Sequence, residues 1–317
     1  MNKSITTIIK VILFSAIVTI CTYFMWDSIQ HIRAEINYRN GYIKLAKKYP
    51  KLAIHNFQEA KRLAPWELHY QLQLAKAYES AAKKATKNIS EFTKFMNLAI
   101  GEYLNLINKD PMNPWYQARL GLIYHDVYNK NKSNKNYQAL AIKHSKKATE
   151  IDKSNPLFSM HYGHLLMNYK KNDLAEAYYL KSLSQDPDLI EIHFNLANIY
   201  NQKNDQNKRF YHYQKTAELL VKLEEKNNNN PTPENKQKIA SFQNARIFLA
   251  QNYLNNKQFK QALYLIDQIP TSVEKLQLLA SLFEQTNKPV DALQIYNVLK
   301  ENLNTTDYDD KIKQLSQ

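Results

Sequence analysis

Glycine is scarce in this chain of 317 residues, which has only four glycines and ten prolines beside 22 tyrosines. Glycine supplies the positive φ angles of tight turns and the bare backbone of phosphate-binding loops. So small a supply disfavours β-sandwiches, dinucleotide-binding folds and P-loop folds. It favours long helices joined by short turns of Asn, Asp and Pro. The sequence therefore predicts an all-α protein.

Cysteine is nearly absent as well, because Cys21 is the only one. A disulfide within the chain and a zinc site built on cysteines are both excluded. The sequence also lacks the GxSxG, Walker, kinase and HExxH motifs. His161 and His164 lie one helical turn apart, but no acidic residue accompanies them at a catalytic spacing. We expect no enzymatic activity, no metal and no cofactor.

The longest apolar run covers residues 5–26 and contains a single charged residue. A helix of about 20 residues crosses the hydrocarbon core of a bilayer. The run ends in Tyr23, Phe24 and Trp26, as an interfacial aromatic belt does. A cleaved signal peptide, which is the alternative, would end in small residues. We expect a short tail (residues 1–4) and an uncleaved anchor in the inner membrane. The positive charges of Lys3, Lys10 and the amino terminus, at the start of the segment, favour a periplasmic body.

Internal repeats organise the rest of the chain. Residues 156–189 and the segment that begins at Ile190 show the same pattern, offset by 34 residues. Small residues in the first helix of each unit allow close helix packing, aromatic residues fill the layer between units, and a proline stops the second helix. The small residues are Gly41, Gly121, Gly163, Ala197, Ala250 and Ala280, the aromatic residues Phe57, Tyr103, Tyr179 and Tyr296, and the prolines Pro65, Pro111 and Pro187.

This pattern resembles the tetratricopeptide repeat (TPR) family over residues 34–300. The resemblance implies a TPR solenoid, a right-handed superhelix of antiparallel helix pairs, preceded here by one transmembrane helix. We expect five pairs in residues 34–221, two in residues 237–302 that pack on the fifth, and a capping segment in residues 303–317. The Asn- and Pro-rich residues 222–236 are expected to form a loop or linker.

The TPR resemblance also implies a concave groove lined by the first helix of each pair. Tyr, Trp, His and Met side chains there suit an extended peptide or an amphipathic helix. The alternative is that about half of these residues pack against neighbouring helices. The lysine and asparagine clamp of some TPR modules is not matched. The groove candidates are Tyr38, Tyr42, His69, Leu72, Lys76, Trp115, Leu122, His125, Met160, His164, Phe194 and Asn198.

The formal net charge of +14 indicates a basic surface. Two segments that exceed the repeat length, near residues 83–94 and 129–137, are interpreted as inserted basic loops. Their lysines suit anionic lipid or polysaccharide, and a solvated surface is the alternative. We do not expect nucleic acid as a partner, because the sequence contains no recognisable binding module. The candidate lysines are Lys83, Lys84, Lys87, Lys130, Lys132 and Lys135.

A second resemblance concerns residues 30–128. The stretches AKRLAPWELHYQLQLAKAY and INKDPMNPWYQARLGLIYHDVY resemble the TPR tail of O-antigen polymerase/ligase-family membrane proteins. Only one membrane helix precedes them here, so the catalytic body of that family is not expected. Two functions follow: a membrane-anchored scaffold for protein partners in envelope assembly, secretion or quality control, and an accessory factor for envelope polysaccharide synthesis. The oligomeric state stays open.

Overall fold

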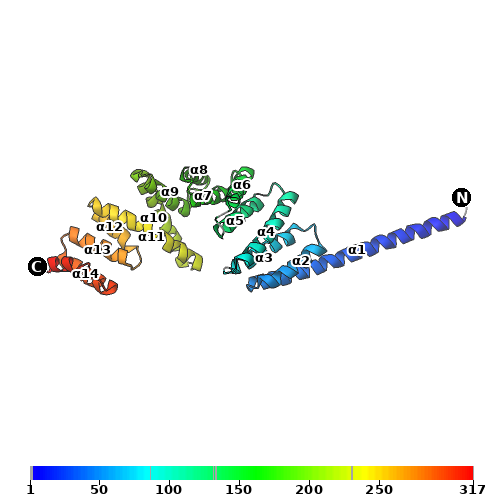
Figure 1. Ribbon diagram of the computed structural model, residues 1–317, viewed down its shortest axis with the longest axis horizontal. Coiled ribbons are helices and arrows are strands. Elements are labelled where there is room, and N and C mark those ends of the chain that lie inside the picture. The colour runs from blue at the N-terminus through cyan, green and yellow to red at the C-terminus, as the bar shows by residue number, and fades with distance from the viewer. Residues whose placement is uncertain (1–2, 86, 131, 133, 230, 317) are drawn as a thin grey trace. The chain divides into compact units, whose positions relative to one another are not determined.

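The computed structural model describes residues 3–85, 87–130, 132, 134–229 and 231–316, with the backbone alone for residues 3–10. Within these residues every regular element is an α-helix, which confirms the all-α prediction (Figure 1). The chain divides into two compact units, Met1–Leu165 and Leu166–Gln317. The boundary falls inside one helix, α7 (Pro156–Asn168).

The helices of the first unit precede α7. They are α1 (Lys3–Ala46), α2 (Pro50–Leu63), α3 (Leu68–Lys84), α4 (Ile89–Lys109), α5 (Pro114–Lys130) and α6 (Lys135–Ile151). The second unit continues after α7 with α8 (Asn172–Leu183), α9 (Ile190–Gln202), α10 (Gln206–Asn229), α11 (Pro233–Asn255), α12 (Phe259–Asp267), α13 (Val273–Gln285), α14 (Pro289–Leu303) and α15 (Asp309–Leu315).

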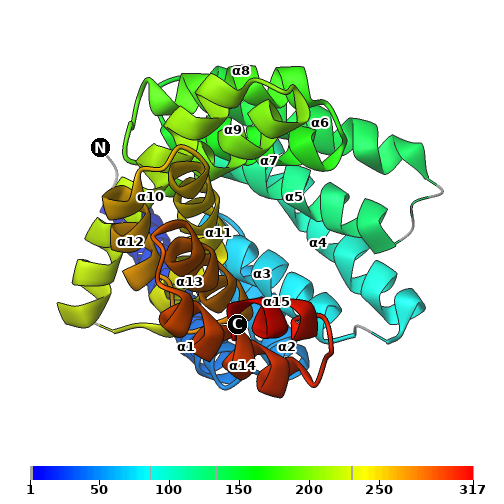
Figure 2. The same cartoon turned by 90° about the vertical axis from the view of Figure 1, so that its left-hand side faces the viewer.

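Successive helices pack as pairs within each unit. The pairs are α1/α2, α3/α4 and α5/α6 in the first unit and α9/α10, α11/α12 and α13/α14 in the second (Figure 2). Phe57, Tyr103 and Tyr179 are buried, as their repeat positions predict. At Gly41 an added Cβ would lie 2.8 Å from Cε1 of Phe57, so the small residue allows the aromatic ring to reach the α1 backbone.

Lysine and asparagine, rather than glycine, adopt the left-handed conformation in the turns within pairs. Lys48, Lys170, Asn204, Lys257 and Asn287 have φ angles between 56° and 62°. Glycine meets this geometry without steric cost, whereas other residues pay for the Cβ contact and asparagine tolerates it best. The short turns expected from the low glycine content are therefore made with residues that fit them less well.

The prediction of two inserted loops is wrong, because most residues of these segments lengthen the neighbouring helices. α3 has 17 residues and α4 has 21, against 13 in α9. Asn88 begins α4 by accepting a hydrogen bond from the Glu91 backbone N–H at 3.0 Å, which satisfies one free donor of the first turn. Of the candidate lysines, Lys83, Lys84, Lys130 and Lys135 lie on helices, and Lys87 and Lys132 lie in turns.

The loop predicted over residues 222–236 is also wrong. Residues 222–229 are the end of α10, and α11 begins at Pro233, whose fixed φ suits the first helical turn. The Thr232 hydroxyl caps α11 by accepting a hydrogen bond from the Asn235 N–H at 3.1 Å. Glu224 holds α10 to α11 through two hydrogen bonds of 2.7 Å from Arg246. The observed division at Leu165 and Leu166 thus differs from the predicted blocks on either side of residues 222–236.

The last pairs pack on the fifth, as expected. Phe194 of α9 contacts Phe242 of α11 edge-to-face, with ring centroids 5.3 Å apart. One core cluster joins Ala197 of α9 to Ala250 of α11 and Leu278 of α13. Beyond them, side chains of α15 and of the turn before it pack on the cluster around Tyr296.

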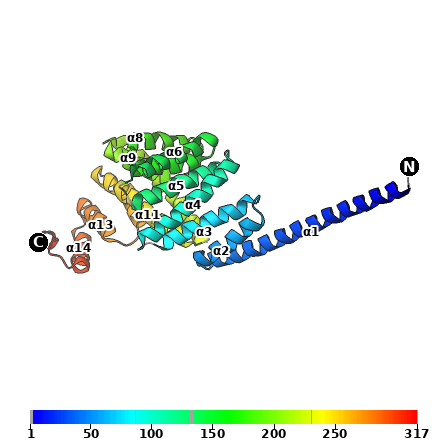
Figure 3. The ribbon, with the colours of Figure 1, turned by 45° about the vertical axis from the view of Figure 1, so that its right-hand side comes forward.

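Helix α1 runs without interruption from the apolar segment into the first repeat pair, and its N-terminal part projects from the other helices of the first unit (Figure 3). Its segment Val11–Ala46 is the one described span that is long and apolar enough to cross a membrane, a property that signal sequences share. Because α1 begins at Lys3, the predicted tail of residues 1–4 is partly helical, and residues 1–2 lie outside the described residues.

Candidate functional site

The first unit contains a cleft of about 580 Å³ between α3, α4 and α5. Three groove candidates line it: Leu72 and Lys76 from α3 and Trp115 from α5. The repeat register therefore brings together part of the predicted groove. The sequence interpretation missed the other lining residues, which are Tyr103, Asn113, Tyr116 and Arg119.

A buried carboxylate organises the base of this cleft. Glu79 accepts hydrogen bonds from the Tyr103 hydroxyl at 2.8 Å and from Arg119 Nε at 3.1 Å, and it also pairs with Arg119 Nη2. Burial raises the pKa of Tyr103, and the nearby Glu79 charge adds to the rise, so the phenol stays a hydrogen-bond donor. The Arg119 side chain remains 39% exposed, so its guanidinium is held in place yet open to a ligand.

Aromatic side chains form the wall of the cleft. Trp115 is 52% exposed and packs edge-to-face on Phe158, with ring centroids 4.7 Å apart. Burial, with a smaller contribution from Asp110, raises the pKa of the neighbouring Tyr116. Lys76 is exposed. Aromatic and aliphatic walls beside two cations suit a peptide that carries an apolar side chain and a carboxylate.

The groove candidates nearer the N-terminus lie outside the lining of this cleft. Tyr38 is half-buried among rings, 6.0 Å from Phe57 and 5.1 Å from His69 between centroids. Tyr42 is exposed and lies 6.5 Å from Tyr38. Nδ1 of His69 is 3.3 Å from a carboxylate oxygen of Glu67. Tyr38 thus serves the packing of the first two pairs, while Tyr42 stays accessible.

The remaining candidates divide between the two units. Leu122 and His125 on α5 and Met160 and His164 on α7 are half-buried and do not line the cleft. Burial lowers the pKa of His125. In the second unit Phe194 packs on α11, and the amide oxygen of Asn198 accepts a hydrogen bond from Tyr213 at 2.8 Å. Phe194 and Asn198 therefore contact neighbouring helices, as the alternative to groove binding predicted.

The candidate lysines gather at the end of the first unit where the turns within pairs lie. Lys83 and Lys130 line one hollow of about 430 Å³ with Phe92 and Asp126. Burial raises the pKa of Asp126, and Lys83 opposes the rise. Lys84 Nζ donates to the Lys48 carbonyl, which places the end of α3 beside the α1–α2 turn. We call this surface the basic edge; it comprises Lys48, Lys83, Lys84, Lys87, Lys130, Lys132 and Lys135.

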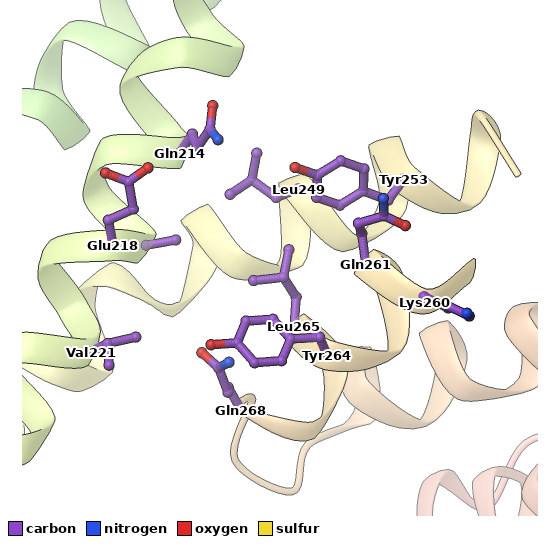
Figure 4. Close-up of a pocket in the computed structure, with 11 residues that line it drawn as sticks. Gln214, Glu218, Val221, Leu249, Tyr253, Lys260, Gln261, Tyr264, Leu265 and Gln268 are labelled. Carbon is purple, nitrogen blue, oxygen red and sulfur yellow. The ribbon is translucent and has the colours of Figure 1, made fainter. Parts of the chain in front are cut away.

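The second unit contains an apolar hollow of about 370 Å³ between α10, α11 and α12 (Figure 4). Leu249, Tyr253, Tyr264 and Leu265 face it, with Glu218 on the α10 side. The sequence interpretation did not identify it, because its residues lie off the predicted groove positions. Most of its accessible lining is apolar, and its polar lining residues are Gln214, Glu218, Lys260, Gln261 and Gln268.

Two buried histidines meet between α9 and α10. Their Nδ1 atoms are 3.0 Å apart, and Nε2 of His193 donates to the Pro187 carbonyl at 3.0 Å. Because burial lowers the pKa of both histidines, both rings are neutral at pH 7, and His193 then accepts a hydrogen bond from Nδ1–H of His212. Burial lowers the pKa of His212 to about 4, with His193 adding to the effect and Glu176 opposing it. Among the described residues, no group of three or more His, Cys, Asp or Glu is placed to hold a metal ion.

We expect the second unit to lose stability as the pH falls from about 6.5 to about 4. The folded form of His212 binds its proton only near pH 4, whereas an unfolded histidine binds it near pH 6.5, so acid favours unfolding within this window and has no such effect above it. Hydrogen exchange of α9 and α10 at pH 7 and pH 5, corrected for intrinsic rates, measures the loss. In H212Q the difference should shrink, and equal protection of the natural chain at both pH values would contradict the prediction.

Solved structures resemble the chain at low identity. MamA has 18% identity, a TM-score of 0.47, and coverage of 57% of this chain and 95% of MamA. A thermophilic TPR protein of Thermus thermophilus has 19% identity and a TM-score of 0.45, with coverage of 66% of this chain and 98% of that protein. The protein pilF of Pseudomonas aeruginosa has 13% identity and a TM-score of 0.46, with coverage of 90% of this chain and 99% of pilF. No protein-family model matches the sequence, and no curated protein matches it.

Proposed function

We propose that this chain is a membrane-anchored scaffold that binds a protein partner through the cleft of its first unit. The cleft carries the proposal because it combines an exposed tryptophan with two cations, Lys76 and Arg119, on a base fixed by Glu79. A preorganised site of this kind loses little entropy on binding. The repeat architecture and the lack of catalytic motifs support a binding role over a catalytic one.

The partner that fits best is a peptide segment with an aromatic or aliphatic anchor and a carboxylate. The anchor would lie against Trp115 and Leu72, and the carboxylate would reach Lys76 and Arg119. With α1 retained in the inner membrane and the body in the periplasm, such a peptide would come from envelope assembly, secretion or quality-control machinery. A topology reporter fused after Gln317 tests this location, and reporter activity in the cytoplasm would overturn it.

Substituting Trp115 with alanine is expected to weaken partner binding about thirtyfold or more, because a tryptophan at the centre of an interface typically contributes about 2 kcal/mol or more. The measurement is photocrosslinking in native membranes from a photoreactive aromatic residue at Tyr116, which lines the cleft and has no assigned contact with the partner. The captured proteins are identified quantitatively.

Trp66 provides a matched control. It has the same exposure as Trp115, 52%, but lies on the α2–α3 turn with its ring 5.1 Å from His31, outside the cleft. W66A should capture the partner as the natural chain does. Equal losses in W115A and W66A, or recovery of lipid or glycan alone, would reject the cleft as a peptide site.

A second candidate function uses the basic edge. About twenty residues separate Trp26 from Ala46, so α1 carries the α1–α2 turn roughly 30 Å beyond the end of the apolar segment. This is about four Debye lengths at physiological salt, too far for the lysines to attract the bilayer that holds α1. The geometry favours an anionic polymer outside the membrane, in line with an accessory role in envelope polysaccharide synthesis. Binding of an acidic polysaccharide should decrease in K83E/K130E. Unchanged binding in this variant would exclude the basic edge as the polysaccharide site.

A further inference from the structure

Helix α1 leaves one apolar stripe uncovered after it emerges from the apolar segment. Ile29, Ile32, Ile36 and Ile43 are between 47% and 61% exposed. The opposite face carries the buried Ala34 and Gly41 and packs on α2. Four half-exposed isoleucines in one line are an unusual surface for a helix that is already part of a folded repeat.

The spacing of the stripe identifies what would cover it. Ile29, Ile36 and Ile43 are seven residues apart, and Ile32 lies between the first two at the spacing of the second core position of a heptad. Apolar residues at these two positions form the seam of a left-handed coiled coil. The same register continues into the apolar segment at Ser15 and Thr22.

The membrane segment fits close helix contact along this register. Ser15 and Thr22 are small, and their hydroxyls donate hydrogen bonds to backbone carbonyls of their own helix at 2.9 Å. They therefore allow two helices to approach without leaving polar groups unsatisfied in lipid. The soluble stripe and the membrane segment thus share one continuous face of one helix.

We propose that α1 pairs in parallel with α1 of a second copy of this chain through this isoleucine stripe. A retained anchor gives all copies the same direction and the same height, so each stripe faces its own counterpart in register. The repeat helices lie on the opposite side of α1 and leave the seam free. Arg39 occupies one seam position and is held by Glu35 of its own chain, Nε to Oε1 2.8 Å, which offsets its charge. The pairing is independent of what the cleft binds.

Disulfide crosslinking of the full chain in proteoliposomes tests the seam. In a C21S background, I36C places a thiol on the stripe, and L52C places one at nearly equal exposure (54% and 57%) on α2. Because a disulfide needs Cβ atoms within about 4.5 Å, I36C should form covalent dimers rapidly and L52C slowly. Equal rates would overturn the proposal.

Charge at the seam gives the second measurement. I36E should weaken self-association in detergent at least about tenfold, because two carboxylates would face each other in place of two isoleucines. L52E should not. Thermal melting by circular dichroism checks that both variants stay folded, since Ile36 is outside the packed core. Mixing I36E with I36K should restore pairing as a mixed dimer. A monomeric natural chain, or a mixture that stays monomeric, would overturn the proposal.

Discussion

Replacing Glu224 with alanine is expected to destabilise the second unit by about 3–5 kcal/mol, because the change leaves a buried guanidinium without its counterion. Arg246 is fully buried, at 0% exposure, and donates two hydrogen bonds of 2.7 Å to Glu224. It also donates to the Gln268 carbonyl at 3.1 Å. The arginine therefore joins α10, α11 and the end of α12, and all three should open together.

Replacing Arg246, the other member of the ion pair, should destabilise the second unit less. In R246M the buried charge is removed together with its desolvation cost, and Glu224, which is partly exposed, can turn to water. E225A changes an exposed neighbour and should have almost no effect. Hydrogen exchange of α10 to α12 in the full chain measures each change. The account is wrong if E224A exchanges no faster than E225A, or if R246M is the more damaging of the two.

The same ion pair explains why the loop over residues 222–236 could not be predicted correctly from composition. A run of four asparagines followed by two prolines favours a turn locally, and the chain does turn, near Thr232. Residues 222–229 are held as a helix by the ion pair between Glu224 and Arg246, which lies 22 residues later in the chain. The sequence around Glu224 does not indicate this interaction. Tertiary contacts decided the state of a segment whose intrinsic preference is weak.

Helix pairing was predictable because its determinants are local and periodic. A glycine that lets two helices meet and an aromatic residue that fills the layer recur at fixed offsets, so Gly41 and Phe57 could be placed without coordinates. The same register found Leu72, Lys76 and Trp115. It missed Arg119, whose position depends on the buried Glu79, and it misplaced Phe194, which α11 covers.

Gly121 tests this packing logic most directly. G121A is expected to destabilise the first unit by about 3 kcal/mol, because an added Cβ would overlap the Ser145 hydroxyl and lie 2.9 Å from the Ser145 backbone nitrogen and 3.1 Å from the Ala141 carbonyl oxygen. A side chain can rotate away, but the backbone of α6 cannot, so α5 and α6 must separate. Chemical denaturation followed by tryptophan fluorescence measures the loss, since Trp115 lies on α5.

Gly101 supplies the opposite case within the same unit. It lies in α4, and a Cβ there would have no neighbouring heavy atom within 4 Å. G101A should therefore stabilise the unit by about 0.5–1 kcal/mol through helix propensity alone. The double variant G121A/S145A separates the two sources of crowding at Gly121: it removes the hydroxyl but keeps the backbone contacts, so most of the destabilisation should remain. Full recovery in that variant would show that side-chain crowding, and not the approach of the α6 backbone, requires glycine at this position.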